Sequence, residues 1–455
     1  MQGQIFDQEK LKVYSKKGFS IYLAVSMCFL LYLLSIWALK GREGFRIIFQ
    51  KGPISDVPMT IFYASVAWLL FGSVLVLLQK KNLTRDNLIV YSAFFINAFL
   101  YLNVLTEKIT YGDYWDYINA AFNLSVGEPV NQRYLYPPFW ATLLQPLVPL
   151  GRDAMTVMLK AVNYASLLLF FTLLYRVCRR YGLAKMPSAL AVFVVTAVNV
   201  PVLRTLGYVQ VNIHVINLIL LSLLFSKKHV YLSALALSLA VHIKMTPVLL
   251  VIPFLWIKDW KWLRWFVVNT AGIVLFTSLM NCIGYYLDLY FLKNVRTILS
   301  VPETIAYRDC SVESFFRATF LNLHLSLKAA LFIAYVLKIG LVILTLWILK
   351  KTVERPPYFQ GEKRMEVIHN GYIVLIVLMT VLSPIVWVHH LVFLVFPFLI
   401  ILKRLTKIGD YFLYGTAYFN VFLLPVFDFY PFSYLRLLGV AICFFLLYRF
   451  SKEEK

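Results

Sequence analysis

Apolar runs of about 20 residues, separated by short polar segments, repeat along most of the chain. A run of this length can cross the hydrocarbon core of a bilayer as one α-helix. We expect fourteen such helices, several of them short, near residues 19–39, 59–79, 87–106, 154–177, 186–203, 211–226, 229–243, 246–257, 265–286, 326–350, 370–386, 391–402, 411–427 and 434–450. The pattern predicts an all-α, polytopic transmembrane protein.

The composition agrees with a membrane protein and excludes an ordinary soluble enzyme. Hydrophobic residues make up 61% of the 455 residues and charged residues only 15%, whereas soluble domains carry about 45–50% and about 25%. The formal net charge of +22 would suggest a nucleic-acid partner in a soluble protein. Here the basic residues lie between apolar runs, as they do in cytoplasmic loops. We therefore expect membrane lipids, and no nucleic acid, as partners.

The basic segments also predict which side of the membrane each loop faces. If the chain crosses the membrane an odd number of times between residues 107 and 178, seven basic segments lie on the same side of the membrane. Both termini are then in the cytoplasm. These segments lie near residues 80–85, 176–185, 227–228, 258–264, 350–364, 403–407 and 449–455. Two large loops, 107–138 and 287–325, then face the exoplasmic side. The apolar stretch 137–150 holds four prolines, which interrupt helices, and is predicted to be re-entrant or interfacial.

Ionisable residues at the edges of apolar runs are functional candidates in a membrane protein. Asp113 opens an aromatic segment in the first large loop, and Asp116 follows about one helical turn later. The Asp113 carboxylate would serve as a general base for a hydroxyl, or as a helix N-cap. Lys244 interrupts two apolar runs on the same side of the membrane. Its ammonium group suits a phosphate, or snorkels to the interface.

A histidine pair forms the third candidate group on this side. His389 and His390 follow Trp387 between two apolar runs. They would hydrogen-bond a phosphate or a sugar, or lie at the membrane interface as a structural pair. Neighbouring residues on a helix do not share a face, and the sequence has no zinc-binding spacing of histidines and cysteines. A metal site is therefore not expected.

The fourth candidate group combines an arginine with two amides. Arg204 is followed by Gln210 and Asn212, whose amides would donate to a sugar or a phosphate, or would join neighbouring helices. The sequence contains no Walker motif and no G-x-S-x-G motif. ATP-driven transport and serine hydrolysis therefore lack support.

Five motifs follow one another in the order of a known family. They are Asp113 to Ala121 (Asp-x-x-x-Tyr-x-x-Ala), Tyr136-Pro137-Pro138 with Pro146, Lys244 to Pro247, Ser311 with Arg317, and Ser383-Pro384 with Trp387 and His389-His390. In this order they resemble glycosyltransferase family 87, the polyprenyl-phosphate-dependent α-mannosyltransferases of the GT-C membrane fold. The resemblance covers residues 110–400. Two positions differ from the family pattern: Val209 stands where glycine often precedes the glutamine, and Asp309-Cys310 stand where Asn-Gln precedes the serine.

The resemblance implies one transmembrane glycosyltransferase domain over residues 1–455. A GT-C core at 80–455 would follow an additional N-terminal hairpin at 19–79. The enzyme would transfer a sugar, with mannose the best candidate, from a polyprenyl-phosphate donor to a hydroxyl of a lipid-linked or glycan acceptor. Transfer would occur with inversion at the exoplasmic face of the cell inner or plasma membrane, and no metal or other cofactor is expected.

The resemblance also implies roles for individual residues. Asp113 would be the general base that takes the acceptor proton. The donor phosphate would be bound by Lys244, His389, His390 and Arg317. The sugar or the acceptor would be contacted by Asp116, Tyr117, Tyr136, Gln210, Asn212, Ser311 and Trp387.

Two alternatives stay open at the level of sequence. A flippase for lipid-linked glycans, without transferase activity, would also carry charges at the membrane edge. Transporters often show inverted repeats and midplane charges, and neither is visible in this sequence. Another donor sugar, such as arabinose or glucose, would need the same types of residue.

Overall fold

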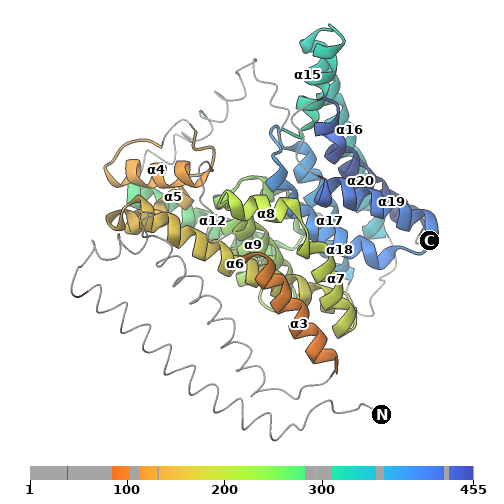
Figure 1. Cartoon of the computed structure of the whole chain (residues 1–455), viewed down its shortest axis with the longest axis horizontal. Helices are drawn as coiled ribbons and strands as arrows, with labels where there is room; N and C mark the ends of the chain where they lie inside the picture. Colours follow the sequence, from red (N-terminus) through yellow and green to blue (C-terminus); the bar gives the residue numbers. More distant parts are fainter. Residues whose placement is uncertain are drawn as a thin grey trace, which may run out of the picture.

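The protein is a bundle of helices in all the segments that its structure, a computed structural model, describes. These segments are residues 85–102, 112–130, 133–281, 309–354, 363–424 and 430–453, with the single residues Ala38 and Lys293. No strand occurs within them (Figure 1), which confirms the all-α prediction. The predicted spans near 19–39 and 59–79, and with them the additional hairpin, lie outside the described residues apart from Ala38.

Five helices of the described part are long and apolar enough to cross a membrane. They belong to α6 (Arg152–Arg180), α12 (Trp260–Asn281), α16 (Leu327–Glu354), α17 (Lys363–Leu382) and α20 (Leu435–Glu453). The number rises to six if α7 (Lys185–Ala197) and α8 (Val200–Gly207), which meet at 64°, count as one bent span. A polytopic membrane protein is confirmed by these helices, whereas the count of fourteen spans is not.

The other elements are shorter, and local sequence explains several of the breaks. They are α3 (Arg85–Leu100), α4 (Tyr114–Ser125), α5 (Phe139–Leu144), η2 (Gln145–Leu150), α9 (Asn212–Phe225), α10 (Val230–Ile243), η3 (Thr246–Val251), α11 (Ile252–Trp256), α15 (Val312–Asn322), η4 (Val388–Leu394), α18 (Val395–Arg404), α19 (Ile408–Tyr418), η5 (Phe419–Leu423) and η6 (Phe432–Tyr434). The proline-rich stretch 137–150 forms two six-residue helices. The predicted span 186–203 is interrupted before α8, where the Asn199 side chain accepts a hydrogen bond from the Val202 N–H at 2.9 Å.

Four of the predicted basic segments meet at one end of the bundle. Arg364 forms an ion pair with Asp259, and this pair joins segments 350–364 and 258–264. Arg364 also donates a hydrogen bond to the Ser226 carbonyl, just after α9, at 3.0 Å. Arg180 donates to the Leu224 carbonyl at the same end of α9 at 2.8 Å. Lys403 Nζ bonds the carbonyl of residue 181, which joins segments 403–407 and 176–185. These contacts place four of the basic segments together, while their cytoplasmic orientation stays a prediction.

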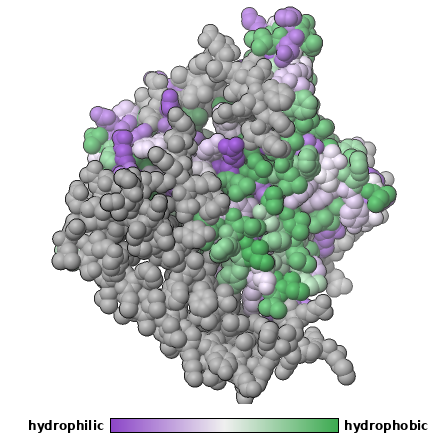
Figure 2. All heavy atoms as spheres, viewed as in Figure 1, coloured by the Kyte–Doolittle hydropathy of each residue, from purple (hydrophilic) through white to green (hydrophobic). Residues whose placement is uncertain are grey.

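Two adjacent helices connect this end to the opposite one. α9 and α10 pack against each other, α9 also packs on α6, and α10 on α12. Each has 14 residues, about 21 Å at 1.5 Å per residue. α4 and α5 pack together at one end of α6 and α12 (Figure 1). A broad apolar area lies over part of the described surface in Figure 2, as lipid-facing helices require.

Candidate active site

Asp113 directly precedes α4, and its side chain faces other polar residues. It occupies the N-cap position, yet its carboxylate accepts no hydrogen bond from the first turn. Helix capping therefore does not account for this residue. The preceding Gly112 lies against the Tyr208 carbonyl, since an added Cβ would come to 3.0 Å from that oxygen. Glycine thus allows the start of α4 to approach the connection between α8 and α9 closely.

Gln210, in that connection, is at the centre of the hydrogen bonds beside Asp113. Its Oε1 accepts hydrogen bonds from the Tyr117 hydroxyl at 3.0 Å and the Tyr136 hydroxyl at 3.5 Å. The Tyr136 hydroxyl also lies 3.4 Å from Asp113 Oδ2 as a donor. Asn163 Nδ2 fixes the backbone by donating to the Gln210 carbonyl at 3.2 Å. Three residues from separate elements are therefore held around one carboxylate.

The backbone before Gln210 is in a conformation that favours glycine. Val209 is buried and has a φ of +52°. A β-branched residue rarely adopts this left-handed region, and the cost is on the order of 1–2 kcal/mol. The positive φ explains why the family pattern often has glycine before the glutamine. Valine at this position adopts the same backbone turn with strain.

Burial raises the pKa of the Asp113 carboxyl above its ordinary value. The Gln210 amide, the Lys244 charge and the Tyr136 hydroxyl act in the opposite direction, because they favour the ionised form, but burial prevails. A carboxylate with a raised pKa binds a proton more readily than an exposed one does. This is the property that a general base for a hydroxyl needs.

Lys244 points into the site from the end of α10. Its extended backbone conformation ends the helix, and its Nζ donates to Asn212 Oδ1 at 2.9 Å. The ammonium also lies over two aromatic rings, 5.9 Å from the Tyr136 centroid and 5.7 Å from that of Phe393. A lysine that only snorkels would extend toward solvent. This one is held beside the residues that surround Asp113.

His389 belongs to the same group of residues, through its backbone. Its carbonyl accepts hydrogen bonds from Thr205 Oγ1 at 3.1 Å and Asn212 Nδ2 at 3.3 Å. Its imidazole is buried, and Nε2 has no hydrogen-bond partner among the described residues. We call Asp113, Tyr117, Tyr136, Gln210, Asn212, Lys244 and His389 the Asp113 cluster.

The second histidine of the pair serves the backbone of its own segment. His390 Nδ1 accepts a hydrogen bond from the Trp387 N–H at 3.3 Å, at the start of η4. The imidazole of His390 also lies against that of His389, with ring centroids 4.6 Å apart. Of the two, His389 has the ring nitrogen available for a ligand.

Ser311 and a residue missed in the sequence, Asp309, fasten the histidine segment to α15. Ser311 is the N-cap of α15 and accepts a hydrogen bond from the Ser314 N–H at 3.1 Å. Asp309 Oδ1 accepts from the N–H groups of Ser311 at 2.9 Å and Val386 at 2.7 Å, and its Oδ2 accepts from the Ser311 hydroxyl at 2.9 Å. The Cys310 N–H donates to the Val386 carbonyl at 2.7 Å. An aspartate two residues before a serine N-cap was the available sequence signal.

Two predicted site residues, Arg317 and Asp116, are not members of the Asp113 cluster as defined above. Arg317 is half-buried on α15, and no hydrogen bond, ion pair or ring contact joins it to the Asp113 cluster within the described segments. α15 and α4 also lie far apart in Figure 1. Asp116 lies in the first turn of α4, half-buried. Their predicted roles stay predictions.

Metal ligands are not grouped in the part of the chain that the structure describes. No set of three histidine, cysteine, aspartate or glutamate side chains comes together there. The Asp113 cluster instead combines one carboxylate, one ammonium, amides, phenols and an imidazole. Such a set can accept a proton and stabilise an anion side by side.

Comparison with known families assigns the chain. Residues 134–362, just over half of the 455, match the sequence model of glycosyltransferase family 87. The chain belongs to this family. It is therefore a membrane glycosyltransferase, which acts on a sugar donor and an acceptor. The match includes Tyr136, Gln210 and Lys244, while Asp113 and His389 lie outside it. No curated protein matches the sequence.

Proposed function

We propose that this family 87 enzyme transfers a hexose, with mannose the best candidate, from a polyprenyl-phosphate donor to an acceptor hydroxyl at the exoplasmic face, with inversion. The observation that carries the proposal is the position of Asp113 and Lys244. A carboxylate and an ammonium lie in one cluster, close enough to influence each other electrostatically, yet they form no ion pair. Each is therefore available for a different part of the reaction.

The carboxylate accounts for the acceptor side of the transfer. Asp113 takes the proton of the acceptor hydroxyl, and the oxygen forms a bond to the anomeric carbon of the donor sugar. The bond from that carbon to the phosphate oxygen breaks in the same step, and its electron pair goes to the phosphate. One displacement of this kind inverts the anomeric configuration, so that a β-linked donor gives an α-linked product.

The ammonium accounts for the donor side. The leaving lipid phosphate gains negative charge as its bond to the sugar breaks, and a cation placed there lowers the barrier. Lys244 is suited to this position, because Asn212 holds its Nζ in the cluster. His389 would donate a further hydrogen bond through its unpartnered Nε2. These groups supply the charge stabilisation from the chain itself, so we propose transfer without a metal.

A lipid-linked donor also fits the position of the cluster in the fold. Asn212 begins α9 and Lys244 ends α10, so the cluster lies at the end of two apolar helices. A prenyl chain could lie among such helices while its phosphate reaches the polar end. The short helices α5 and η2, which are packed against α4, would form part of the groove for that chain.

The test is a donor screen with the purified full-length protein in lipid nanodiscs. Prenyl-phosphate mannose, arabinose and glucose, and nucleotide-linked mannose, are each supplied with radiolabelled sugar. We expect transfer from a prenyl-phosphate donor in the presence of a chelator, and a loss of at least about 10³-fold in Asp113→Asn. Asp153→Asn, an exposed aspartate in the first turn of α6, is the matched control.

Three results would contradict the proposal. Transfer only from the nucleotide sugar would exclude the lipid donor, and loss of transfer with chelator would exclude the metal-free mechanism. Full activity of Asp113→Asn would exclude its role as the base. A wild-type protein that moves glycolipids between leaflets and leaves the sugar on its lipid would be a transporter instead.

A further inference from the structure

Arg204 is a cation beside the Asp113 cluster that the proposed reaction has not yet used. It lies in the last turn of α8, and its side chain is exposed. One guanidinium nitrogen donates to the Tyr208 hydroxyl at 2.7 Å, and the guanidinium carbon lies 5.5 Å from the centroid of the same ring. Tyr208 thus holds the arginine in one position while leaving its other N–H groups for a ligand.

Tyr208 connects this arginine to His389. The two rings meet edge to face, with centroids 5.9 Å apart, and α8 packs on η4. Tyr208 also lies against Gly112, the residue before Asp113. Arg204 is therefore connected to the part of the site that holds Asp113 and the His389 imidazole.

Lys244 reaches His389 by a second, similar route. Its Nζ is bonded to the Asn212 side chain, and the amide nitrogen of that side chain donates to the His389 carbonyl at 3.3 Å. The positive charges of Lys244 and Arg204 both act on the His389 imidazole. Two cations on different helices are thus connected to one histidine, which has a buried nitrogen without a partner among the described residues.

We propose that Arg204 is a second cationic ligand of the donor phosphate, beside His389 and together with Lys244. This inference rests on the proposed function. The chemistry of the leaving group calls for two cations. A sugar phosphodiester carries one negative charge, and the lipid phosphate that leaves carries up to two, because its second pKa is about 6. Lys244 matches the charge of the bound donor, and Arg204 stabilises the charge that appears when the bond to the sugar breaks.

Arginine suits this position better than lysine would. Its planar fork can donate two parallel hydrogen bonds to one phosphate, and the hydrogen bond to the Tyr208 hydroxyl keeps the fork oriented. Arg317, the arginine that the sequence motif points to, has no comparable connection to His389 among the described residues. The structure thus favours Arg204 for a role that the motif gives to another residue.

The experiment compares Arg204→Ala, Arg204→Lys and Arg152→Ala in the full-length protein. Arg152 is the matched control, since it is also exposed and lies 5.2 Å from the centroid of an aromatic ring, that of Phe122, but has no connection to His389. Transfer kinetics are measured with prenyl-phosphate mannose, and binding is measured with prenyl phosphate alone. We expect Arg204→Ala to lose about 10- to 100-fold in kcat/KM for the donor and to bind prenyl phosphate more weakly. Arg204→Lys should fall in between, and Arg152→Ala should match the wild type.

Each other outcome overturns the inference in a recognisable way. Wild-type transfer and phosphate binding in Arg204→Ala would leave the proposed function intact and remove Arg204 from the site. An equal loss in Arg152→Ala would indicate a general effect of surface charge. A change confined to KM for the acceptor, or to binding of vesicles that contain anionic phospholipid, would assign Arg204 to another phosphate group. Absence of any transfer in the wild type would overturn the proposed function as well.

Discussion

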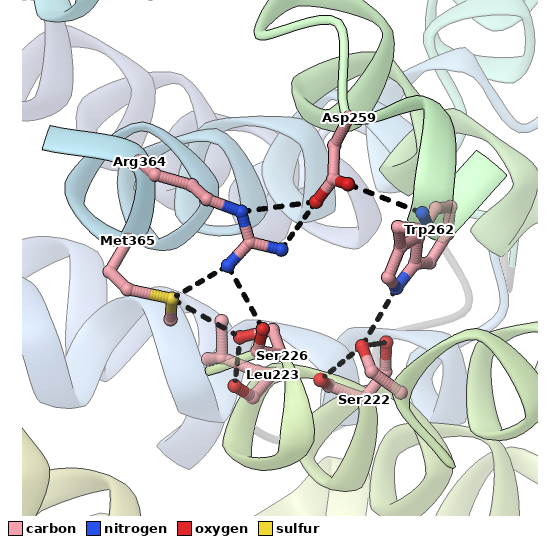
Figure 3. A network of polar contacts seen from close by, with 8 residues as sticks. Ser222, Leu223, Ser226, Asp259, Trp262, Arg364 and Met365 are labelled. Carbon is pink, nitrogen blue, oxygen red and sulfur yellow. Dashed lines mark hydrogen bonds and ion pairs between the residues drawn. The ribbon is translucent and has the colours of Figure 1, made fainter. Parts of the chain in front are cut away.

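The two ends of the helix pair α9 and α10 carry polar clusters that differ in how completely they are hydrogen-bonded. At one end lies the Asp113 cluster. At the other lies the Asp259 cluster, which consists of Ser222, Ser226, Ser233, Asp259, Trp262, Arg364 and Tyr372. Figure 3 shows its centre, around Asp259, Trp262 and Arg364. Both place a carboxylate and a cation near apolar helices, so their composition does not distinguish them.

In the Asp259 cluster the polar side chains are used by the fold itself. Asp259 accepts hydrogen bonds from Arg364 through Oδ2 and from the Trp262 N–H, at 3.2 Å, through Oδ1. Trp262 Nε1 donates to Ser233 Oγ at 2.9 Å, and the Ser222 hydroxyl meets that of Tyr372 at 2.9 Å. None of these side chains has a buried polar atom without a partner. Such a network joins helices and leaves nothing for a ligand.

The Asp113 cluster is incomplete in comparison. His389 Nε2 is buried without a partner, and Gln210 Nε2, beside the Asp113 carboxyl, makes no hydrogen bond of ordinary geometry within the described segments. Unpaired buried polar atoms cost free energy, and folded proteins tolerate them chiefly where a ligand, water or chemistry makes use of them. The comparison supports our proposal that the Asp113 cluster carries the chemistry, while the Asp259 cluster joins helices.

After Asp113 itself, the largest effect is expected from the cation of the Asp113 cluster. Lys244→Met keeps the length of the side chain and removes its charge, so the leaving phosphate loses its nearest cation. We expect kcat for sugar transfer to fall about 10²- to 10³-fold, with an unchanged unfolding temperature. Lys261→Met, an exposed lysine near the Asp259 cluster, should behave as the wild type. A Lys244→Met enzyme with normal kcat would remove Lys244 from the reaction.

A smaller loss is expected from Asp309, which supports the histidine segment from outside the cluster. Asp309→Ala leaves the N–H groups of Ser311 and Val386 without their acceptor, at a cost of about 1–3 kcal/mol in the free energy of unfolding. Transfer should fall as well, because the segment that carries His389 loosens. Asp309→Asn should restore both properties, since its amide oxygen can accept both hydrogen bonds. Equal behaviour of the two variants, measured by thermal unfolding and by transfer, would contradict this role.

Arg364 tests the other side of the comparison. Arg364→Met removes the partner of Asp259. Because 36% of the arginine side chain is exposed, we expect the free energy of unfolding to fall by only about 1–2 kcal/mol. Transfer at low temperature should stay normal. Arg264→Met, an exposed arginine on α12, is the control and should change neither property. Loss of transfer by a folded Arg364→Met protein would show that the Asp259 cluster is not merely structural.

The smallest effect is expected from Tyr136→Phe and concerns pH. The Tyr136 hydroxyl favours the ionised form of Asp113, so its removal should raise the pKa of that carboxyl further. A general base works above its pKa, and transfer should therefore be lost at a higher pH in the variant as the medium is acidified. The pH profile of kcat measures this shift. A shift toward lower pH, or none, would contradict the placement of the hydroxyl beside the base.

The sequence predicted the fold class, and the structure brings several of the predicted site residues together, whereas the details of their contacts could not be predicted. Periodicity predicted the apolar helices, because it depends on residues near one another in sequence. The residues of the Asp113 cluster are brought together instead by contacts such as that of Asn212 with His389, which are 177 residues apart in the sequence. The left-handed turn at Val209 and the bonds of Asp309 are likewise set by partners that no local pattern specifies.

The most direct test of the contrast between the clusters measures sugar transfer and thermal unfolding together for two matched variants. Asp113→Asn should abolish transfer while the unfolding temperature stays at or above that of the wild type, because a buried charge is removed without loss of an ion pair. Asp259→Asn should lower the unfolding temperature and keep transfer in the folded protein. The opposite pattern, with an active Asp113→Asn enzyme or a folded but inactive Asp259→Asn enzyme, would contradict the assignment of chemistry to one end of the helix pair and stability to the other.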